Sequence, residues 1–111
     1  MSNTVSERKI TQYTHPEIRL VFAFMEGCHW CEEFKSKTLP MVRALNLRYQ
    51  ILMEFEQMAK YGADDHGYPF TAICDSAGYP IEKIGHFMSV GELMDKIQEV
   101  VKSINNGESN A

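Results

Sequence analysis

The sequence predicts an α/β fold, with a central mixed β-sheet flanked by helices on both faces. Three observations predict it. The nearly unbroken apolar run at residues 18–24 is typical of a strand covered on both sides. A Cys-His-Trp-Cys motif at residues 28–31 comes next and is followed by helix formers. Two further apolar runs, at residues 70–74 and 81–84, flank turn-forming residues and predict a β-hairpin.

Before the first strand, Thr4 and Glu7 have the spacing of a capping box, which favours a short helix to about residue 13, with an edge strand at residues 9–14 as the alternative. The helix that opens at Cys28 should kink near Ser36, because Pro40 removes one hydrogen bond and clashes with the preceding turn. The side chains expected on its inner side are Phe34, Met41, Val42 and Leu45.

The second half of the chain adds a strand at residues 48–55 and a short helix at residues 57–61. Ser89 is expected to cap a last amphipathic helix, with Val90, Leu93, Met94, Ile97, Val100 and Val101 facing inward. Strands joined through a helix run parallel, and the hairpin contributes antiparallel strands, so the sheet is mixed. We expect one domain at residues 1–104 and a flexible C-terminal tail at residues 105–111.

Composition restricts the possible partners and the compartment. A formal net charge of −4 gives nucleic acid or an anionic membrane little to attract, so neither partner is expected. The N-terminus has no hydrophobic signal-peptide core, and no apolar run approaches the roughly 18 residues that span a membrane. Three cysteines, two of them in one motif, suit a reducing compartment better than a secreted disulfide scaffold. A cytoplasmic location is therefore expected.

From residue 18 to about residue 101, the chain resembles the thioredoxin-like family. The matching features are the strand leading into Cys28-His29-Trp30-Cys31, Ala59-Lys60-Tyr61-Gly62, Tyr68-Pro69-Phe70-Thr71, the hairpin, Gly85 and the closing helix. The resemblance implies a redox-active thiol–disulfide oxidoreductase of cell redox homeostasis. It also implies that Pro69 is cis and lies beside the cysteines, where Tyr68 and Pro69 bind the backbone of a substrate.

Three features depart from the family pattern. Phe22 occupies the place of the buried aspartate that helps deprotonate the second cysteine in thioredoxin itself. His29 and Trp30 stand where thioredoxin has Gly-Pro, and the helix proline comes later. The chain therefore resembles a divergent member of the thioredoxin-like family. The group that accepts the proton of the second cysteine is unassigned. Glu54 is one hypothetical replacement, although a polar residue at the edge of the sheet is the simpler interpretation.

By position, Cys28 is the predicted catalytic nucleophile and Cys31 the resolving thiol. Helix-start N–H groups lower the pKa of the first thiol. His29 as an imidazolium would do the same, but a cation at a helix N-terminus is itself disfavoured. Glu26, together with Glu32 and Glu33, should raise it, which predicts a reductase or mild exchanger and not a strong oxidant. Trp30 is either an exposed docking platform or a shield over Cys31.

The expected substrate is a disulfide in a protein or a small molecule, and no cofactor is expected. The family resemblance leads us to expect a flavoprotein reductase or glutathione as the electron donor. Two other classes of function stay open. One is a zinc or iron–sulfur module using Cys28, Cys31 and His29 or Cys74, although a structural zinc site needs four ligands and no second close cysteine pair exists. The other is a partner-binding protein without redox turnover. Cys74 itself is interpreted as a small buried strand residue.

Overall fold

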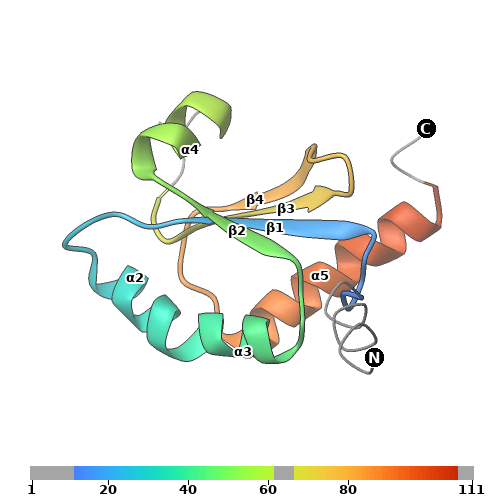
Figure 1. Ribbon diagram of the computed structural model, residues 1–111, viewed down its shortest axis with the longest axis horizontal. Coiled ribbons are helices and arrows are strands. Elements are labelled where there is room, and N and C mark those ends of the chain that lie inside the picture. Colours follow the sequence, from blue (N-terminus) through green and yellow to red (C-terminus); the bar gives the residue numbers. More distant parts are fainter. Residues whose placement is uncertain (1–11, 62–66, 108–111) are drawn as a thin grey trace, which may run out of the picture.

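The computed structural model describes residues 12–61 and 67–107, except for the side chains of residues 54, 55, 58 and 59 (Figure 1). Residues 1–11, which hold most of the predicted N-terminal helix or strand, and the end of the predicted tail, residues 108–111, lie outside the described residues. Residues 12–14 are not helical, and Thr14 forms a single parallel bridge with Leu47. Along the chain, the elements are β1 (Ile18–Ala23), α2 (His29–Glu33), the π-helical stretch η1 (Phe34–Thr38), α3 (Leu39–Ala44), β2 (Tyr49–Leu52), α4 (Glu54–Tyr61), β3 (Phe70–Asp75), β4 (Pro80–Ile84) and α5 (Val90–Asn105).

Four strands form one mixed sheet in the order β2-β1-β3-β4. β1 runs parallel to β2, whereas the β1–β3 and β3–β4 pairs are antiparallel. Helices α2, α3 and α5 lie on one side of the sheet and α4 lies on the other (Figure 1). The predicted α/β class, with its mixed sheet and helices on both faces, is confirmed. Within the described residues, none of the helices has the length and apolar character needed to cross a bilayer.

The strand predicted at residues 48–55 is too long. β2 ends at Leu52, and α4 begins at Glu54. The cause is local, because the Glu56 carboxylate accepts a hydrogen bond from the backbone N–H of Met53 at 2.9 Å, as in half of a capping box. This interaction starts a helix where the apolar pattern alone suggested a continuing strand.

The larger part of the core lies between the sheet and the helices α2, α3 and α5. Alternate residues of β1 supply Ile18, Leu20 and Phe22, as expected for a strand whose side chains alternate between faces. The helices contribute Phe34, Leu39, Val42, Leu93, Ile97 and Val100. Ser89 forms the predicted cap of α5 in a full capping box with Glu92. Val90, Met94 and Val101, predicted to face inward, are partly buried, and Met94 and Val101 pack against this core.

Around Ser36, where Pro40 was predicted to kink the helix, the structure has a wide π-helical turn. The Leu39 N–H donates to the Phe34 carbonyl, five residues earlier, within the π-helical stretch that contains Ser36. A wide turn accommodates the missing N–H of Pro40 and adds a residue, which shifts the phase of the helix that follows. Met41, predicted to face inward, is therefore 41% exposed, while Thr38 and Leu39 are buried.

Thr38 ties this helical segment to the loop before α5. Its hydroxyl is fully buried and donates a 2.7 Å hydrogen bond to the Met88 carbonyl, 50 residues away in the sequence. A buried carbonyl that loses such a donor keeps its desolvation cost. The bond therefore couples the position of the motif-bearing helix to the loop between β4 and α5.

The opposite face of the sheet packs against α4. Val21, Ala23, Phe70, Ala72 and Cys74 pack there with Tyr61. Cys74 is buried in β3, as predicted, and its sulfur lies 3.9 Å from the Tyr61 hydroxyl. Burial raises the pKa of Tyr61 to about 12 and also raises the pKa of the Cys74 thiol.

We expect Thr38→Val to lower the free energy of unfolding by about 1–2 kcal/mol, because the Met88 carbonyl loses its buried donor. Urea denaturation measures the change. Ser36→Ala serves as the control, since the Ser36 hydroxyl bonds the Glu33 carbonyl on the exposed surface and its loss should cost little. Equal stabilities for Thr38→Val and the wild type would contradict the importance of this bond.

Stability should also fall in alkali. The folded-state pKa of Tyr61 is about 12, against 10.0 for a free tyrosine, so unfolding releases its proton between these values. The Tyr61 contribution is complete below pH 10 and is lost as the pH rises towards 12. Urea denaturation across this window measures the decline, and Tyr61→Phe should flatten it. An equally steep decline in Tyr61→Phe would contradict the assignment.

Candidate active site

The Cys28-to-Cys31 motif begins where β1 leads into a turn and then a helix, as predicted. Gly27 has a φ of +75°, a conformation that most side chains disfavour, and turns the chain towards the helix. Cys28 is the N-cap of α2, and its sulfur accepts a hydrogen bond from the Cys31 N–H at 3.1 Å. From α2 through η1 to α3, the helical run continues to Ala44. The first sulfur therefore lies at a helix start, where N–H groups and the dipole stabilise negative charge.

Cys28 and Cys31 form a disulfide, with their Cα atoms 5.2 Å apart. The two residues differ in access. Cys28 is partly exposed, whereas Cys31 is completely buried. The Cys31 sulfur is also 3.5 Å from the backbone N–H of Met25, which holds it from the turn side. An outside molecule can therefore reach the first sulfur but not the second.

The loop before β3 lies beside the disulfide, at the same edge of the sheet. The peptide bond between Tyr68 and Pro69 is cis, and Pro69 is buried. The Tyr68 carbonyl oxygen lies 3.9 Å from the Cys28 sulfur, although the residues are 40 positions apart in the sequence. The structure thus brings together both cysteines and the predicted substrate-binding pair Tyr68 and Pro69.

Trp30 opens onto a shallow pocket beside the disulfide. The pocket is lined by Trp30, Tyr68, Gly85, His86 and Phe87. Trp30 is 55% exposed, and its ring centroid lies 5.4 Å from that of Phe87. This exposure favours the docking-platform interpretation of Trp30 over the shield interpretation.

Two of the pocket residues, His86 and Phe87, were not selected as site residues from the sequence. The one available signal was their place directly after Gly85, which belongs to the family resemblance. The approach of two loops explains their position. A Cβ atom on Gly67 would lie 2.5 Å from the Gly85 carbonyl oxygen, so the loop before Pro69 packs tightly against the loop after β4.

The charges around the motif are more balanced than the sequence suggested. Glu32 pairs with Lys35 at 3.2 Å, and Glu33 pairs with Lys37 at 2.7 Å. The hydrogen bond from Lys37 lowers the pKa of Glu33, and the positive charges of Lys37 and then His29 lower it further. Lys35 and Lys37 thus offset part of the negative charge that was expected to disfavour a Cys28 thiolate.

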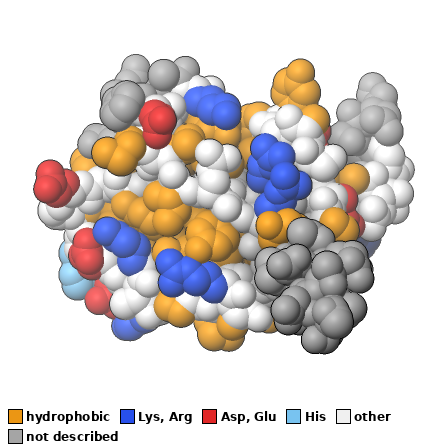
Figure 2. Space-filling view, in the orientation of Figure 1, with side chains coloured by type: hydrophobic (Ala, Val, Ile, Leu, Met, Phe, Trp, Pro, Cys, Tyr) orange, Lys and Arg blue, Asp and Glu red, His pale blue; other side chains and the backbone are white. Residues whose placement is uncertain are grey.

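Glu26 differs from these two carboxylates. It is exposed and lines a hollow beside β2 with Phe24, Ile51, Leu52 and Met53. Figure 2 shows hydrophobic side chains between β2 and the helices α2 and α3, with lysine and arginine side chains along those helices. Glu26 therefore remains the residue whose negative charge is expected to disfavour a Cys28 thiolate.

Phe22 fills the place of the missing acid with an aromatic ring. It is fully buried, with ring centroids 5.2 Å from Phe34 and 5.9 Å from Tyr49. Its partner across the ladder, Thr71, is also buried, and the Thr71 hydroxyl finds no hydrogen-bond partner among the described residues. Glu54 begins α4 instead of lying in a strand, and its side chain lies outside the described part. Its proposed role as a base stays a prediction.

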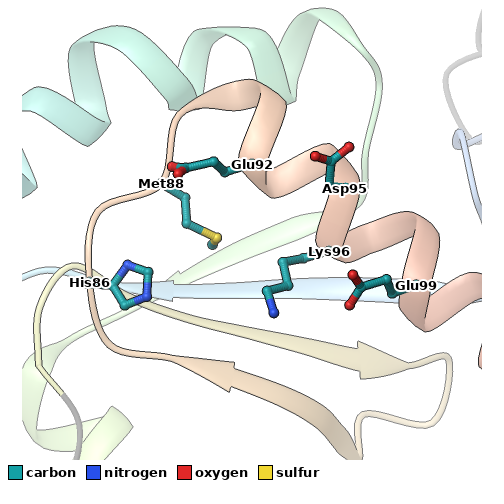
Figure 3. A pocket seen from close by; sticks show the side chains of 6 residues that line it. All are labelled: His86, Met88, Glu92, Asp95, Lys96 and Glu99. Atoms are coloured by element: carbon teal, nitrogen blue, oxygen red, sulfur yellow. The ribbon is translucent and has the colours of Figure 1, made fainter.

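A further pocket is also lined by His86 and carries three acidic side chains. His86 and Met88 come from the loop after β4, and Glu92, Asp95, Lys96 and Glu99 come from α5 (Figure 3). Lys96 also pairs with Glu82 of β4 at 3.7 Å. Across residues 12–61 and 67–107, no three His, Cys, Asp or Glu side chains gather closely enough to hold a metal ion.

Comparison with known proteins finds similar solved structures. One is described as "DsbH Oxidoreductase", with a TM-score of 0.57 and 15% identity over 78% of this chain and 73% of that chain. Another, the J-Trx1 fragment of ERdj5, has a TM-score of 0.58 and 15% identity over 88% of this chain. The match covers 48% of that fragment, so this chain spans about half of its length.

No family model matches the sequence, and no curated protein sequence is significantly similar to it. The similarity to these two solved structures is therefore one of fold. The shared architecture, the strand order β2-β1-β3-β4 and a disulfide at the start of the helix after β1 identify this chain as a protein of thioredoxin-like fold.

Proposed function

We propose that this chain is a thiol–disulfide oxidoreductase, which reduces disulfides in proteins or small molecules through Cys28 and Cys31. The observation that carries the proposal is the unequal access to two bonded sulfurs. Cys28 is partly exposed at a helix start, and Cys31 is completely buried beside it. This arrangement suits a first thiol that attacks an outside disulfide and a second thiol that reacts only within the chain.

In the proposed reaction, the Cys28 thiolate attacks one sulfur of the substrate disulfide. The substrate S–S bond breaks as the mixed disulfide forms, and the departing substrate sulfur takes up a proton. The Cys31 thiol then gives up its proton, which ends on the departing substrate sulfur, and the Cys31 sulfur attacks the Cys28 sulfur. The mixed disulfide breaks, the second substrate sulfur leaves and is protonated, and the Cys28–Cys31 disulfide remains. The substrate gains two electrons and two protons, and the described structure corresponds to the oxidised product state.

Repeated turnover requires a donor of two electrons and two protons. We propose a flavoprotein reductase or glutathione in a reducing, cytoplasmic environment, with a role in cell redox homeostasis. Neither nucleic acid nor a membrane enters the proposed reaction. The exposed Trp30 and the pocket it shares with Phe87 and His86 support docking of a partner beside the reactive sulfur.

The wild type should accelerate insulin reduction by a dithiol, measured as turbidity. Cys28→Ser should lower this activity by at least about 100-fold, because it removes the attacking thiolate. Cys31→Ser should accumulate the mixed disulfide, since the resolving thiol is lost.

Cys74→Ala is the matched control, because it removes the thiol buried on the opposite face of the sheet and should leave turnover intact. Metal content is measured on the same purified proteins. Tightly bound zinc or iron lost in Cys28→Ser, without insulin reduction, would favour the metal-binding class. The absence of both bound metal and insulin reduction would favour a partner-binding protein.

Equilibration with glutathione should place the potential of the Cys28–Cys31 pair on the reducing side of about −180 mV. Glu26→Gln should make the potential less negative by about 10–20 mV, because removing a nearby negative charge stabilises the thiolate form. Glu99→Gln, on the exposed surface of α5, is the control and should leave the potential unchanged. A potential of about −120 mV would reverse the proposed direction.

A further inference from the structure

The side chain of Tyr68 is held by a buried residue that the reaction itself does not use. The Tyr68 hydroxyl donates a hydrogen bond to the side-chain oxygen of Gln57, which belongs to α4. Gln57 is 1% exposed, and its side-chain nitrogen finds no partner among the described residues. A buried amide with an unpaired donor is unfavourable for stability, and an apolar side chain would fill this position at lower cost. Stability therefore does not explain why glutamine occupies position 57.

The other end of Tyr68 faces the reactive sulfur. Its carbonyl oxygen lies 3.9 Å from the Cys28 sulfur, and its backbone continues into the cis bond to Pro69. On the preceding side, Gly67 packs against the Gly85 carbonyl. The buried Pro69 on one side and the close approach of Gly67 to Gly85 on the other confine the Tyr68 backbone, and the hydrogen bond to Gln57 fixes the direction of its ring.

We propose that Gln57 is a positioning residue, which orients Tyr68 so that its backbone meets the substrate segment at Cys28. This inference rests on the proposed disulfide exchange and adds a residue from the opposite face of the sheet. Precise placement of a docking group matters because small displacements of reacting atoms strongly lower a rate. A substrate that binds the Tyr68 backbone should react more slowly when Gln57 is replaced. A small reagent that attacks only the Cys28 sulfur should react at an unchanged rate.

The experiment compares two reagents on the reduced protein. With a dithiol as the electron donor, Gln57→Met and Tyr68→Phe should each slow reduction of a peptide disulfide about 3- to 10-fold in kcat/KM, mainly through KM. The rate of Cys28 alkylation by iodoacetamide should stay within about twofold of the wild type, because this reaction requires no backbone docking. The double variant should be no slower than either single variant, since both substitutions remove the same bond.

Tyr79→Phe is the matched control, because Tyr79 is 72% exposed on the hairpin, and its hydroxyl should not affect either reagent. Thermal unfolding should show Gln57→Met to be as stable as the wild type. If that variant fails to fold, Tyr68→Phe tests the same bond from its other end.

Wild-type rates with the peptide disulfide in both single variants would overturn the inference while leaving the proposed function intact. Equal losses with iodoacetamide and with the peptide would also overturn it, because the substitutions would then disturb Cys28 itself. An inactive wild type would overturn the proposed function, and this inference with it.

Discussion

The pairing of Ala23 with Phe70 is the interaction on which the site depends. Ala23 ends β1 and Phe70 begins β3, and the antiparallel ladder places them side by side. The residues that follow β1 and those that precede β3 must therefore emerge at the same edge of the sheet. Cys28 lies five positions after Ala23 and Tyr68 two positions before Phe70, so this one pair brings the sulfur and the Tyr68 carbonyl together. Both residues of the pair are completely buried, which fixes the register.

Much of the fold follows from patterns that short segments contain. The strand at β1, the helix start at Cys28, the hairpin and the cap at Ser89 each have a local signature, and the structure places them as expected. The errors arise where two local effects compete. Glu56 starts a helix inside an apolar run that also fits a strand, and Pro40 adds a wide turn that moves Met41 to the surface. Apolar periodicity alone cannot show a side chain that bonds backwards to the main chain or a turn with an extra residue.

The residues of the site also fall into those that the sequence could predict and those that it could not. The two cysteines, Trp30, Tyr68 and Pro69 could be selected from the sequence, since a motif or a family resemblance marks them. The partners of these residues could not, because they depend on contacts between distant segments. Phe87 meets Trp30 only once the loop after β4 is in place, and Gln57 meets Tyr68 only through the position of α4. The lysines that pair with Glu32 and Glu33 lie at helical spacing, so this balance was available from the sequence.

Complete burial of Cys31 beside a partly exposed Cys28 also affects how the reduced protein withstands peroxide. Peroxide would meet Cys28 first and convert its thiolate to a sulfenic acid. The Cys31 thiol is already within bonding range, so it can condense with that group, releasing water and forming the disulfide. This internal condensation competes with further oxidation to the irreversible sulfinic and sulfonic acids. The same geometry therefore protects the exposed sulfur from permanent chemical damage.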